Sequence, residues 1–206
     1  MKDAYSLHMD KDCLSAFYEK MYGAYVAIFK RMGLDFIVVE ADGGAMAAGG
    51  AKTHEFQLVA DIGEDTLVTV PGTGYAANIE KAPTQRLGLK PQAASELTKF
   101  STPNQKTCEE VAAAHGFDIT HTLKALVMQV IRGEKTHFYM VMLLGDDQLN
   151  EIKFKNAMAA DHARPAQAHE LEKLGLIKGF MGPTVEAQGL SVVYDLTVDM
   201  NSSYVV

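Results

Sequence analysis

The sequence has little cysteine, no apolar run of eighteen residues and no surplus of basic residues. Its two cysteines, Cys13 and Cys108, lie far apart and lack metal-ligand spacing, which indicates a cytoplasmic protein with reduced thiols. We expect both to be small buried side chains. Without a long apolar run or a basic-then-apolar leader, a membrane-spanning or secreted protein is disfavoured.

Acidic residues outnumber basic ones, 26 to 19, for a formal net charge of −7. Because each phosphate contact needs a cation, this balance argues against a protein that holds nucleic acid by bulk electrostatics, although local basic patches stay open. The seven histidines show no HxxxH or similar pairing, so the sequence offers no metal site. At 206 residues the chain can form one large or two small domains with a proper core.

The first 82 residues predict one long helix among short strands. Asp10 or Asp12 caps a helix whose apolar residues recur at three- and four-residue spacing from Leu14 to Met32. Residues 42–51 are rich in glycine but lack a phosphate-binding spacing, so this loop is expected to leave backbone room for a neighbour or a ligand. Strands are expected at residues 1–8, 36–41, 54–60 and within 63–70, and a helix at 75–82.

The second unit is predicted to follow a linker at residues 83–91, which begins and ends with proline. Thr107 and Glu110 have the spacing of a capping box, which starts a short helix. The runs 120–130 and 137–144, separated by the turn RGEK, predict a β-hairpin. Helices are expected at 149–158 and 166–174, and a last strand at 190–195.

Lys124 interrupts the otherwise apolar run THTLKALVMQV. An ammonium in a buried strand either reaches water past the sheet edge or faces a cleft where an anion or a backbone carbonyl receives it. The strand alone leaves both alternatives open.

Two further features of the second unit could share a cleft with Lys124. The segment GFMGP, residues 179–183, has glycines that let backbone amides approach an anion or a carbonyl, and a proline that fixes its shape. Asp195 ends the last strand. Taken alone, the segment is an ordinary loop and the aspartate an ordinary turn residue.

Long strings of the sequence resemble the bacterial-type prolyl-tRNA synthetase, in order and in spacing. They are MKDAYSLHMD, YGAYVAIFKRMGLDF, THEFQ, GEDTLV, YAANIEKA and LNEIK. The resemblance implies an α+β fold. Residues 1–82 would be part of a class II catalytic domain with an antiparallel sheet and helices, starting inside the second strand of motif 2, where Asp3 would be a substrate-binding residue. Residues 92–206 would be a mixed α/β, YbaK-type aminoacyl-tRNA editing domain that lacks its C-terminal end.

The same resemblance implies the site residues. In the editing domain, Lys124 matches the lysine that engages the tRNA 3′ end, and Asp195 matches an editing-site aspartate. The loop around the misattached aminoacyl group, GxxGP, is matched by Gly179, Gly182 and Pro183.

In the catalytic domain, the family's SHEF segment near the proline pocket is matched by His54, Glu55 and Phe56, with Thr53 in place of the usual serine. Because His54 and Glu55 are adjacent, a regular strand points them to opposite faces.

For a complete enzyme the resemblance implies charging of tRNA-Pro with proline, using ATP and Mg²⁺, in a cytoplasmic homodimer without membrane contact. The editing domain would hydrolyse mischarged alanyl-tRNA without a cofactor. This chain lacks motif 1, the arginine strand of motif 2, motif 3, the anticodon-binding domain and the family's editing-site histidine. Both ends therefore read as cut, and we expect this polypeptide alone not to make prolyl-adenylate.

Two other functions stay open. A free-standing trans-editing deacylase has the same chemistry, but it has no use for the synthetase-like residues 1–82. A non-catalytic tRNA-binding or assembly fragment belongs to a different class. Deacylation and gel-shift assays with charged tRNA separate the two, since turnover favours the deacylase and binding without turnover favours the fragment.

Overall fold

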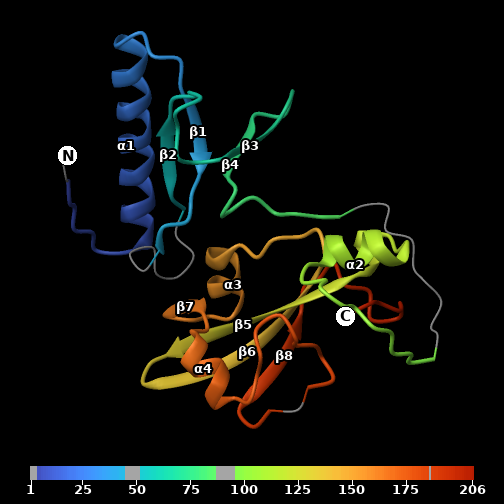
Figure 1. Ribbon diagram of the computed structural model, residues 1–206. Coiled ribbons are helices and arrows are strands. Elements are labelled where there is room, and N and C mark those ends of the chain that lie inside the picture. Colours follow the sequence, from blue (N-terminus) through green and yellow to red (C-terminus); the bar gives the residue numbers. More distant parts are fainter. Residues whose placement is uncertain (1–3, 45–51, 87–95, 186) are drawn as a thin grey trace. The chain divides into compact units, whose positions relative to one another are not determined.

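The structure is a computed structural model that describes residues 4–44, 52–86, 96–185 and 187–206. The chain divides into two compact units, Met1–Ala82 and Pro83–Val206 (Figure 1). The α+β fold class predicted from the sequence is confirmed, because the described part of each unit combines a four-stranded sheet with one or more helices. None of the helices in the described ranges has the length and apolar character that crossing a bilayer requires.

The N-terminal unit is one long helix and a small sheet. Helix α1 (Lys11–Arg31) begins at Asp10, whose side chain accepts from the Cys13 amide as an N-cap. The sheet has the order β2-β1-β4-β3. Its strands are β1 (Ile37–Glu40), β2 (His54–Gln57), β3 (Leu67–Val70) and β4 (Tyr75–Asn78). The pairs β1/β2 and β3/β4 are antiparallel, and Glu40 and Ala77 join them in parallel.

Aromatic rings hold α1 against this sheet. The Phe56 ring lies between the rings of Tyr22, Tyr25 and Phe29, with centroid distances of 5.5–5.7 Å. The predicted apolar stripe therefore packs only in part, since Leu14, Ile28 and Met32 are exposed.

Three local predictions for this unit are wrong. Residues 4–8 form no strand, and Asp3 lies outside the described residues. Residues 75–82 are not a helix, since Tyr75–Asn78 pairs with β3 as strand β4 and a turn follows. The pairing buries Ala76 and Ala77, so tertiary contact overrides the helix propensity of alanine. Cys13 is exposed rather than buried, because it lies on the first turn of α1.

The C-terminal unit is a twisted sheet with a helix on each side. The predicted hairpin is confirmed as β5 (Leu123–Arg132) and β6 (Lys135–Leu144), paired antiparallel over ten residues. Strand β7 (His162–Pro165) joins β5 antiparallel, and β8 (Leu190–Tyr194) joins β6 in parallel, for the order β7-β5-β6-β8. The sequence did not indicate β7.

Alternation along the hairpin builds two cores. Met140, Met142 and Leu144 face Leu171 of α4 (Ala168–Lys173), while Val141 and Leu143 face Phe154 of α3 (Glu151–Ala157). Figure 1 shows α3 and α4 on opposite sides of the sheet. Two further elements, α2 (Cys108–His115) and the 3-10 helix η2 (Ile119–His121), precede β5 and lead the chain to one end of the sheet.

Candidate functional site

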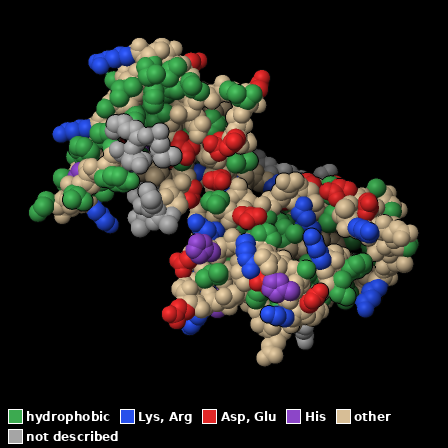
Figure 2. Space-filling model, turned by 60° about the vertical axis from the view of Figure 1, so that its left-hand side comes forward, with side chains coloured by type: hydrophobic (Ala, Val, Ile, Leu, Met, Phe, Trp, Pro, Cys, Tyr) green, Lys and Arg blue, Asp and Glu red, His purple; other side chains and the backbone are tan. Residues whose placement is uncertain are grey.

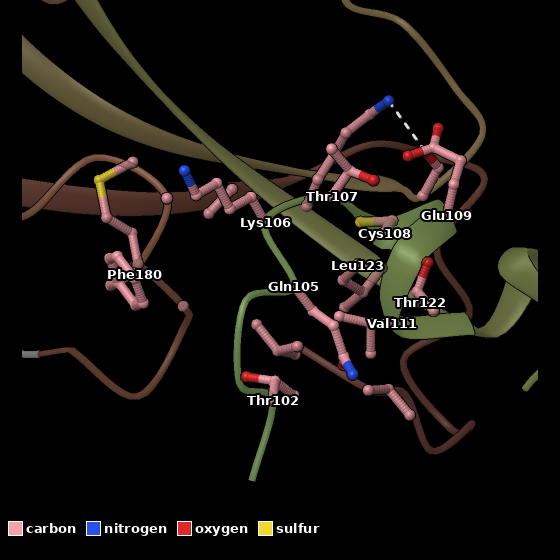
Figure 3. Close-up of a pocket in the computed structure, with 18 of the residues that line it drawn as sticks. Thr102, Gln105, Lys106, Thr107, Cys108, Glu109, Val111, Thr122, Leu123 and Phe180 are labelled. Carbon is pink, nitrogen blue, oxygen red and sulfur yellow. Dashed lines mark hydrogen bonds between the residues drawn. The ribbon is translucent and has the colours of Figure 1, made fainter. Parts of the chain in front are cut away.

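A pocket of about 880 Å³ lies at the end of the sheet where β5 begins. It is lined from four directions: the segment before α2 and its first turn, the start of β5, Gly145 after β6, and the loop at residues 179–185. Val205 and Val206 complete the lining. Figure 3 shows Phe180 on one side of the pocket and Cys108 and Glu109, at the start of α2, on the other.

Lys124 lines this pocket from the second residue of β5. Its side chain is half-buried, and its Nζ donates to the Gly145 carbonyl oxygen at 3.0 Å. An ammonium has three donors, so one carbonyl leaves it capacity to bind a ligand. The sequence left two alternatives for this ammonium, water past the sheet edge or a cleft. In the structure it lies in a cleft and donates to a backbone carbonyl.

The predicted glycine loop lines the same pocket through Gly179 and Gly182. Gly179 has φ +84°, a left-handed conformation that side chains other than glycine adopt at a cost. Gly182 is buried, and a Cβ atom built on it would lie 2.8 Å from Val206 Cγ1. The loop therefore needs glycine at position 179 for its conformation, whereas a side chain at position 182 would displace the exposed Val206.

The charged side chains on the pocket lining are mostly basic: Lys99, Lys106 and Lys124 against one carboxylate, Glu109. The Glu109 backbone amide and the Thr107 hydroxyl hold the pKa of Glu109 below its ordinary value, and the charge of Lys124 adds to this effect. Glu109 therefore stays ionised at neutral pH. The remaining excess of positive charge favours an anionic ligand.

Helix α2 presents its N-terminus to the pocket. Thr107 Oγ1 accepts from the Glu110 amide, and Glu110 Oε2 accepts from the Thr107 amide, each at 3.2 Å. The capping box predicted from the sequence is thereby confirmed. It fixes the first turn of the helix, and with it the positions of Cys108 and Glu109 at the pocket wall.

Two of the predicted editing residues lie outside the lining. Pro183 is half-buried beside the pocket. Asp195 follows β8, and its Oδ1 accepts from the Thr197 hydroxyl at 2.7 Å and from the Thr197 amide at 2.9 Å. The structure brings Lys124, Gly179 and Gly182 together, but it does not bring the Asp195 carboxylate into the pocket.

The three residues predicted for a proline pocket lie on β2 of the N-terminal unit. His54 and Phe56 face α1, where His54 Nδ1 and the Tyr18 hydroxyl are 2.8 Å apart. Burial raises the pKa of Tyr18. Glu55 is exposed and accepts from Gln57 Nε2 at 2.8 Å. His54 and Glu55 thus belong to opposite faces, as their adjacency predicts.

Several pocket residues were missed in the sequence. Gly145 directly follows the apolar run 137–144, and nothing in the sequence indicates that its carbonyl receives Lys124. Lys99, Lys106 and Phe180 carry no spacing that sets them apart from surface residues. Lys106 directly precedes the capping box, and this position is its only signal in the sequence. Among the described residues, no group of three or more His, Cys, Asp or Glu side chains could hold a metal ion.

Comparison with known proteins gives a family match and close relatives. Residues 102–206 match the family described as the aminoacyl-tRNA editing domain. The chain is 42% identical to a proline--tRNA ligase of Stenotrophomonas maltophilia over 207 residues, which are 100% of this chain and 36% of that protein. It is 43% identical to a proline--tRNA ligase of Pelobacter propionicus over 200 residues, 96% of this chain and 34% of that one. The chain thus spans about a third of the length of these relatives.

Among solved structures, the chain resembles "a putative trans-editing enzyme for prolyl tRNA synthetase" at 21% identity and a TM-score of 0.38, over 46% of this chain and 57% of that one. A likeness at this TM-score adds nothing to the assignment. The family match covers the unit that carries the pocket, from Thr102 onward. The chain therefore belongs to the aminoacyl-tRNA editing domain family.

Proposed function

We propose that this chain is part of a proline--tRNA ligase and that its C-terminal unit hydrolyses the ester bond of mischarged alanyl-tRNA-Pro. The observation that carries the proposal is the meeting of Lys124 and the 179–182 loop at one pocket with an excess of lysines. The family match and the identity to proline--tRNA ligases along the whole chain support it. The acceptor end of a tRNA supplies both groups that this pocket suits, a phosphate and an ester carbonyl.

In the proposed reaction Lys124 anchors a phosphate or the terminal ribose of the tRNA. Backbone amides of the 179–182 loop donate to the ester carbonyl, where negative charge develops as water attacks. Removing one such donor typically costs a hundredfold or more in rate, so the loop accounts for much of the proposed acceleration. Water attacks the carbonyl carbon, the ester C–O bond breaks, and the ribose hydroxyl leaves with a proton.

Cys108 is not assigned the role of nucleophile, although it lines the pocket. A cysteine nucleophile of this kind transfers its proton to a neighbouring base, most often a histidine. The described lining contains no histidine that could take its proton. Hydrolysis by water alone needs no protein nucleophile.

A second hydrolytic site has a physical rationale in this kind of enzyme. A difference of one methylene in an amino-acid pocket yields only about 1–3 kcal/mol of discrimination. Alanine is smaller than proline, so a synthetic site built for proline cannot exclude it sterically. A separate pocket that accepts alanine corrects the error.

For the complete enzyme we propose proline, ATP and tRNA-Pro as substrates, Mg²⁺ as cofactor, a homodimer and a cytoplasmic location. His54, Glu55 and Phe56 are proposed to lie near the proline pocket of that enzyme, and Asp3 in its motif 2. No step of the ATP chemistry is assigned to residues of this chain.

The test is single-turnover deacylation of alanyl-tRNA-Pro by the purified 206-residue chain, with alanine release measured against time. The parent chain is expected to release alanine faster than buffer, and Lys124→Ala to reduce the rate at least tenfold, because the acceptor end loses its anchor. Lys135→Ala is the matched control, since Lys135 is an exposed lysine at the other end of the same hairpin. Its rate should equal that of the parent.

Three results would contradict the proposal. Alanine release by the parent chain no faster than in buffer, with tRNA bound in a gel-shift assay, would instead favour a non-catalytic binding fragment. Equal deacylation rates for the parent and Lys124→Ala would show that Lys124 does not anchor the tRNA. Deacylation of alanyl-tRNA at the same rate whichever tRNA carries it would favour a general trans-editing deacylase.

A further inference from the structure

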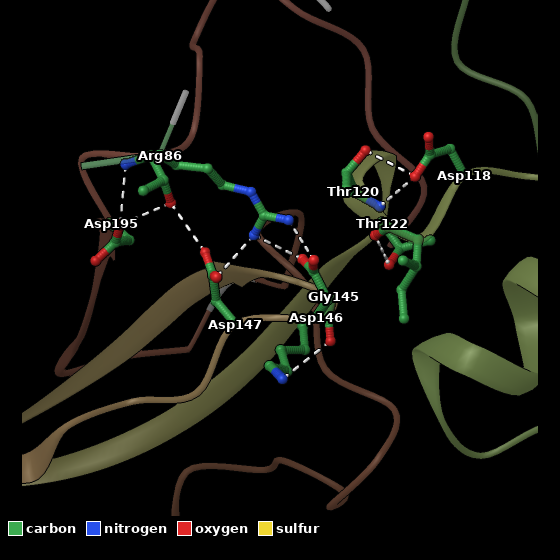
Figure 4. A network of polar contacts seen from close by, with 11 residues as sticks. Arg86, Asp118, Thr120, Thr122, Gly145, Asp146, Asp147 and Asp195 are labelled. Atoms are coloured by element: carbon green, nitrogen blue, oxygen red, sulfur yellow. Dashed lines mark hydrogen bonds and ion pairs between the residues drawn. The ribbon is translucent and has the colours of Figure 1, made fainter. Parts of the chain in front are cut away.

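Arg86 is held by two carboxylates in the segment that was predicted to be a linker. Its Nη1 donates to Asp146 Oδ1 at 2.8 Å and to Asp147 Oδ1 at 2.7 Å, and its Nη2 pairs with Asp146 Oδ2 (Figure 4). The Arg86 side chain is 24% exposed and those of the two aspartates 31%. The donors of a planar guanidinium point in fixed directions, so a guanidinium that hydrogen-bonds two carboxylates restrains their positions. Arg86 therefore restrains the turn after β6.

That turn also holds the lysine of the pocket. Gly145, directly before Asp146, donates its amide to the Thr122 carbonyl oxygen at 2.8 Å and accepts from Lys124 Nζ at 3.0 Å. The Gly145 carbonyl belongs to the peptide group that it shares with Asp146. Holding the Asp146 side chain therefore also restrains the direction in which that carbonyl points.

The same contacts control charge next to Lys124. The Arg86 guanidinium holds the pKa of Asp146 below its ordinary value, and the charge of Lys124 acts in the same direction. Arg86 thus pairs with Asp146, an anion that would otherwise attract the Lys124 ammonium. With Arg86 in place, the ammonium meets a neutral carbonyl and keeps its charge for a ligand.

Asp195 joins this network from the other side. The single hydrogen of the Thr197 hydroxyl is shared between two carboxylates: Thr197 Oγ1 lies 2.7 Å from Asp195 Oδ1 and 3.3 Å from Asp147 Oδ2. The Asp195 amide donates to the Met142 carbonyl oxygen on β6. Asp195 is therefore tied to the turn that carries Gly145, although it does not line the pocket.

We propose that Arg86 is a positioning residue for the proposed deacylation: through Asp146 and Asp147 it orients the Gly145 carbonyl and thereby fixes the Lys124 ammonium at the pocket. The proposal rests on the proposed function for its effect on rate. Its effect on Lys124 itself does not depend on that function. Asp195 supports the same turn through Thr197.

The first experiment measures Lys124 without any reaction of tRNA. The 206-residue chain and its Arg86→Ala variant are acetylated briefly with acetic anhydride, and the modification of each lysine is read by peptide mass mapping. Lys124 should react severalfold more slowly in the variant, because its ammonium leaves Gly145 and pairs with the Asp146 carboxylate that Arg86 no longer holds, while Lys135 reacts equally in both. Arg132→Ala is the control for loss of a structural arginine, since Arg132 donates to the Met158 carbonyl and to Tyr139. It should leave Lys124 reactivity unchanged.

The second experiment is a double-mutant cycle in single-turnover deacylation of alanyl-tRNA-Pro. Arg86→Ala should lower the rate by about tenfold to a hundredfold, as expected when a group in the site is displaced by about 1 Å. Arg86→Lys should recover part of the rate, because it keeps the charge but not the two-pronged geometry. Arg86→Ala combined with Lys124→Ala should be no slower than Lys124→Ala alone, because both changes remove one function.

The outcomes separate this inference from the proposed function. Unchanged Lys124 acetylation in Arg86→Ala overturns the inference, whatever the rates. The inference is also overturned if the deacylation rate of the double variant is lower than that of Lys124→Ala by the same factor by which Arg86→Ala lowers the rate of the parent. Changed acetylation with no deacylation by any chain supports the positioning role and refutes the proposed reaction. If Arg86→Ala unfolds, Arg86→Lys carries the same acetylation test, and unchanged reactivity there is the contradicting result.

Discussion

At the scale of single residues, Gly145 carries two constraints in one position. Its carbonyl receives the Lys124 ammonium, and its Cα has no room for a side chain. A Cβ atom built there lies 1.9 Å from Thr122 Oγ1, 2.9 Å from the Ile119 carbonyl oxygen and 3.0 Å from Cys108 Cβ. Thr122 is 2% exposed, so it cannot move aside into solvent.

Gly145→Ala is therefore expected to destabilise the C-terminal unit by about 1–3 kcal/mol, the usual cost of overpacking a filled site. Urea unfolding followed by circular dichroism measures this change. The matched control is Gly23→Ala on α1, where a Cβ atom meets nothing within 4 Å. Because alanine favours a helix over glycine by about 1 kcal/mol, the control should be neutral or stabilising. Equal stability of Gly145→Ala and the parent would contradict the packing at this turn.

Single residues also show what the sequence could predict of the site. Lys124 was found because a cation inside an apolar strand is costly and must be explained. Arg86 was missed because its partners lie 60 and 61 residues away, and no local pattern marks such a pair. Asp195 was placed in the pocket by resemblance, but its carboxylate bonds Thr197, because a strand-end aspartate readily accepts from the residue two positions on. Its role in editing stays a prediction.

At the scale of elements, local signals succeeded where tertiary contacts agree with them. The hairpin at β5 and β6 follows from two apolar runs around a short turn, and α2 follows from its capping box. The segment 75–82 failed because its alanines have helix propensity, whereas pairing with β3 decides the conformation. Strand β7 was missed because His162–Pro165 is short and lacks alternation, and only its pairing with β5 makes it a strand.

Three elements of the C-terminal unit meet at one buried carboxylate. Glu170 of α4 is 8% exposed, and Arg164 of β7 donates to both of its oxygens at 2.7 and 2.9 Å. Gln129 of β5 donates to Oε1 at 2.6 Å, and the Gln167 amide donates to Oε2 at 2.7 Å. The Arg164 guanidinium is the main cause that lowers the pKa of Glu170 from 4.5 to about 2. The ionised form of Glu170 is thus the one that joins β5, β7 and α4.

Glu170→Gln is expected to lower the free energy of unfolding by about 2 kcal/mol at pH 7. The NH₂ group of the new amide would face the N–H donors of Arg164, so one hydrogen bond is lost. A carboxyl whose pKa is lowered on folding contributes stability above its unfolded value of 4.5, and this contribution is lost as the pH falls toward 2. The difference between parent and variant should therefore shrink between pH 4.5 and pH 2. Urea unfolding of both chains across this range measures it.

The control for this prediction is Glu172→Gln, on the same helix but exposed. It should change stability by less than about 0.5 kcal/mol, as surface substitutions usually do. A pH-independent difference for Glu170→Gln would show that its effect comes from shape and not from charge.

At the scale of the whole molecule, the distribution of charge decides more than its sum. The net charge of −7 predicts that the protein does not bind nucleic acid by bulk electrostatics. Figure 2 shows acidic and basic side chains interspersed over the face in view. The pocket instead gathers three lysines and one carboxylate. A local excess of this kind suits the end of a nucleic acid, whereas a long basic face would hold its length.

The distribution of arginines leads to a prediction for the whole polypeptide. Residues 1–82 contain a single arginine, Arg31, which lies in the last turn of α1. Adenylate formation needs cations placed around the ATP phosphates, where charge develops in the transition state. The purified 206-residue chain is therefore expected to show no proline-dependent ATP–pyrophosphate exchange above a no-enzyme blank.

A complete proline--tRNA ligase, assayed beside it, is the positive control. Because Lys124 and the 179–182 loop lie in the other unit, alanyl-tRNA-Pro deacylation by the same preparation should persist. Exchange by this chain would mean that lysines can replace the missing arginines around the phosphates.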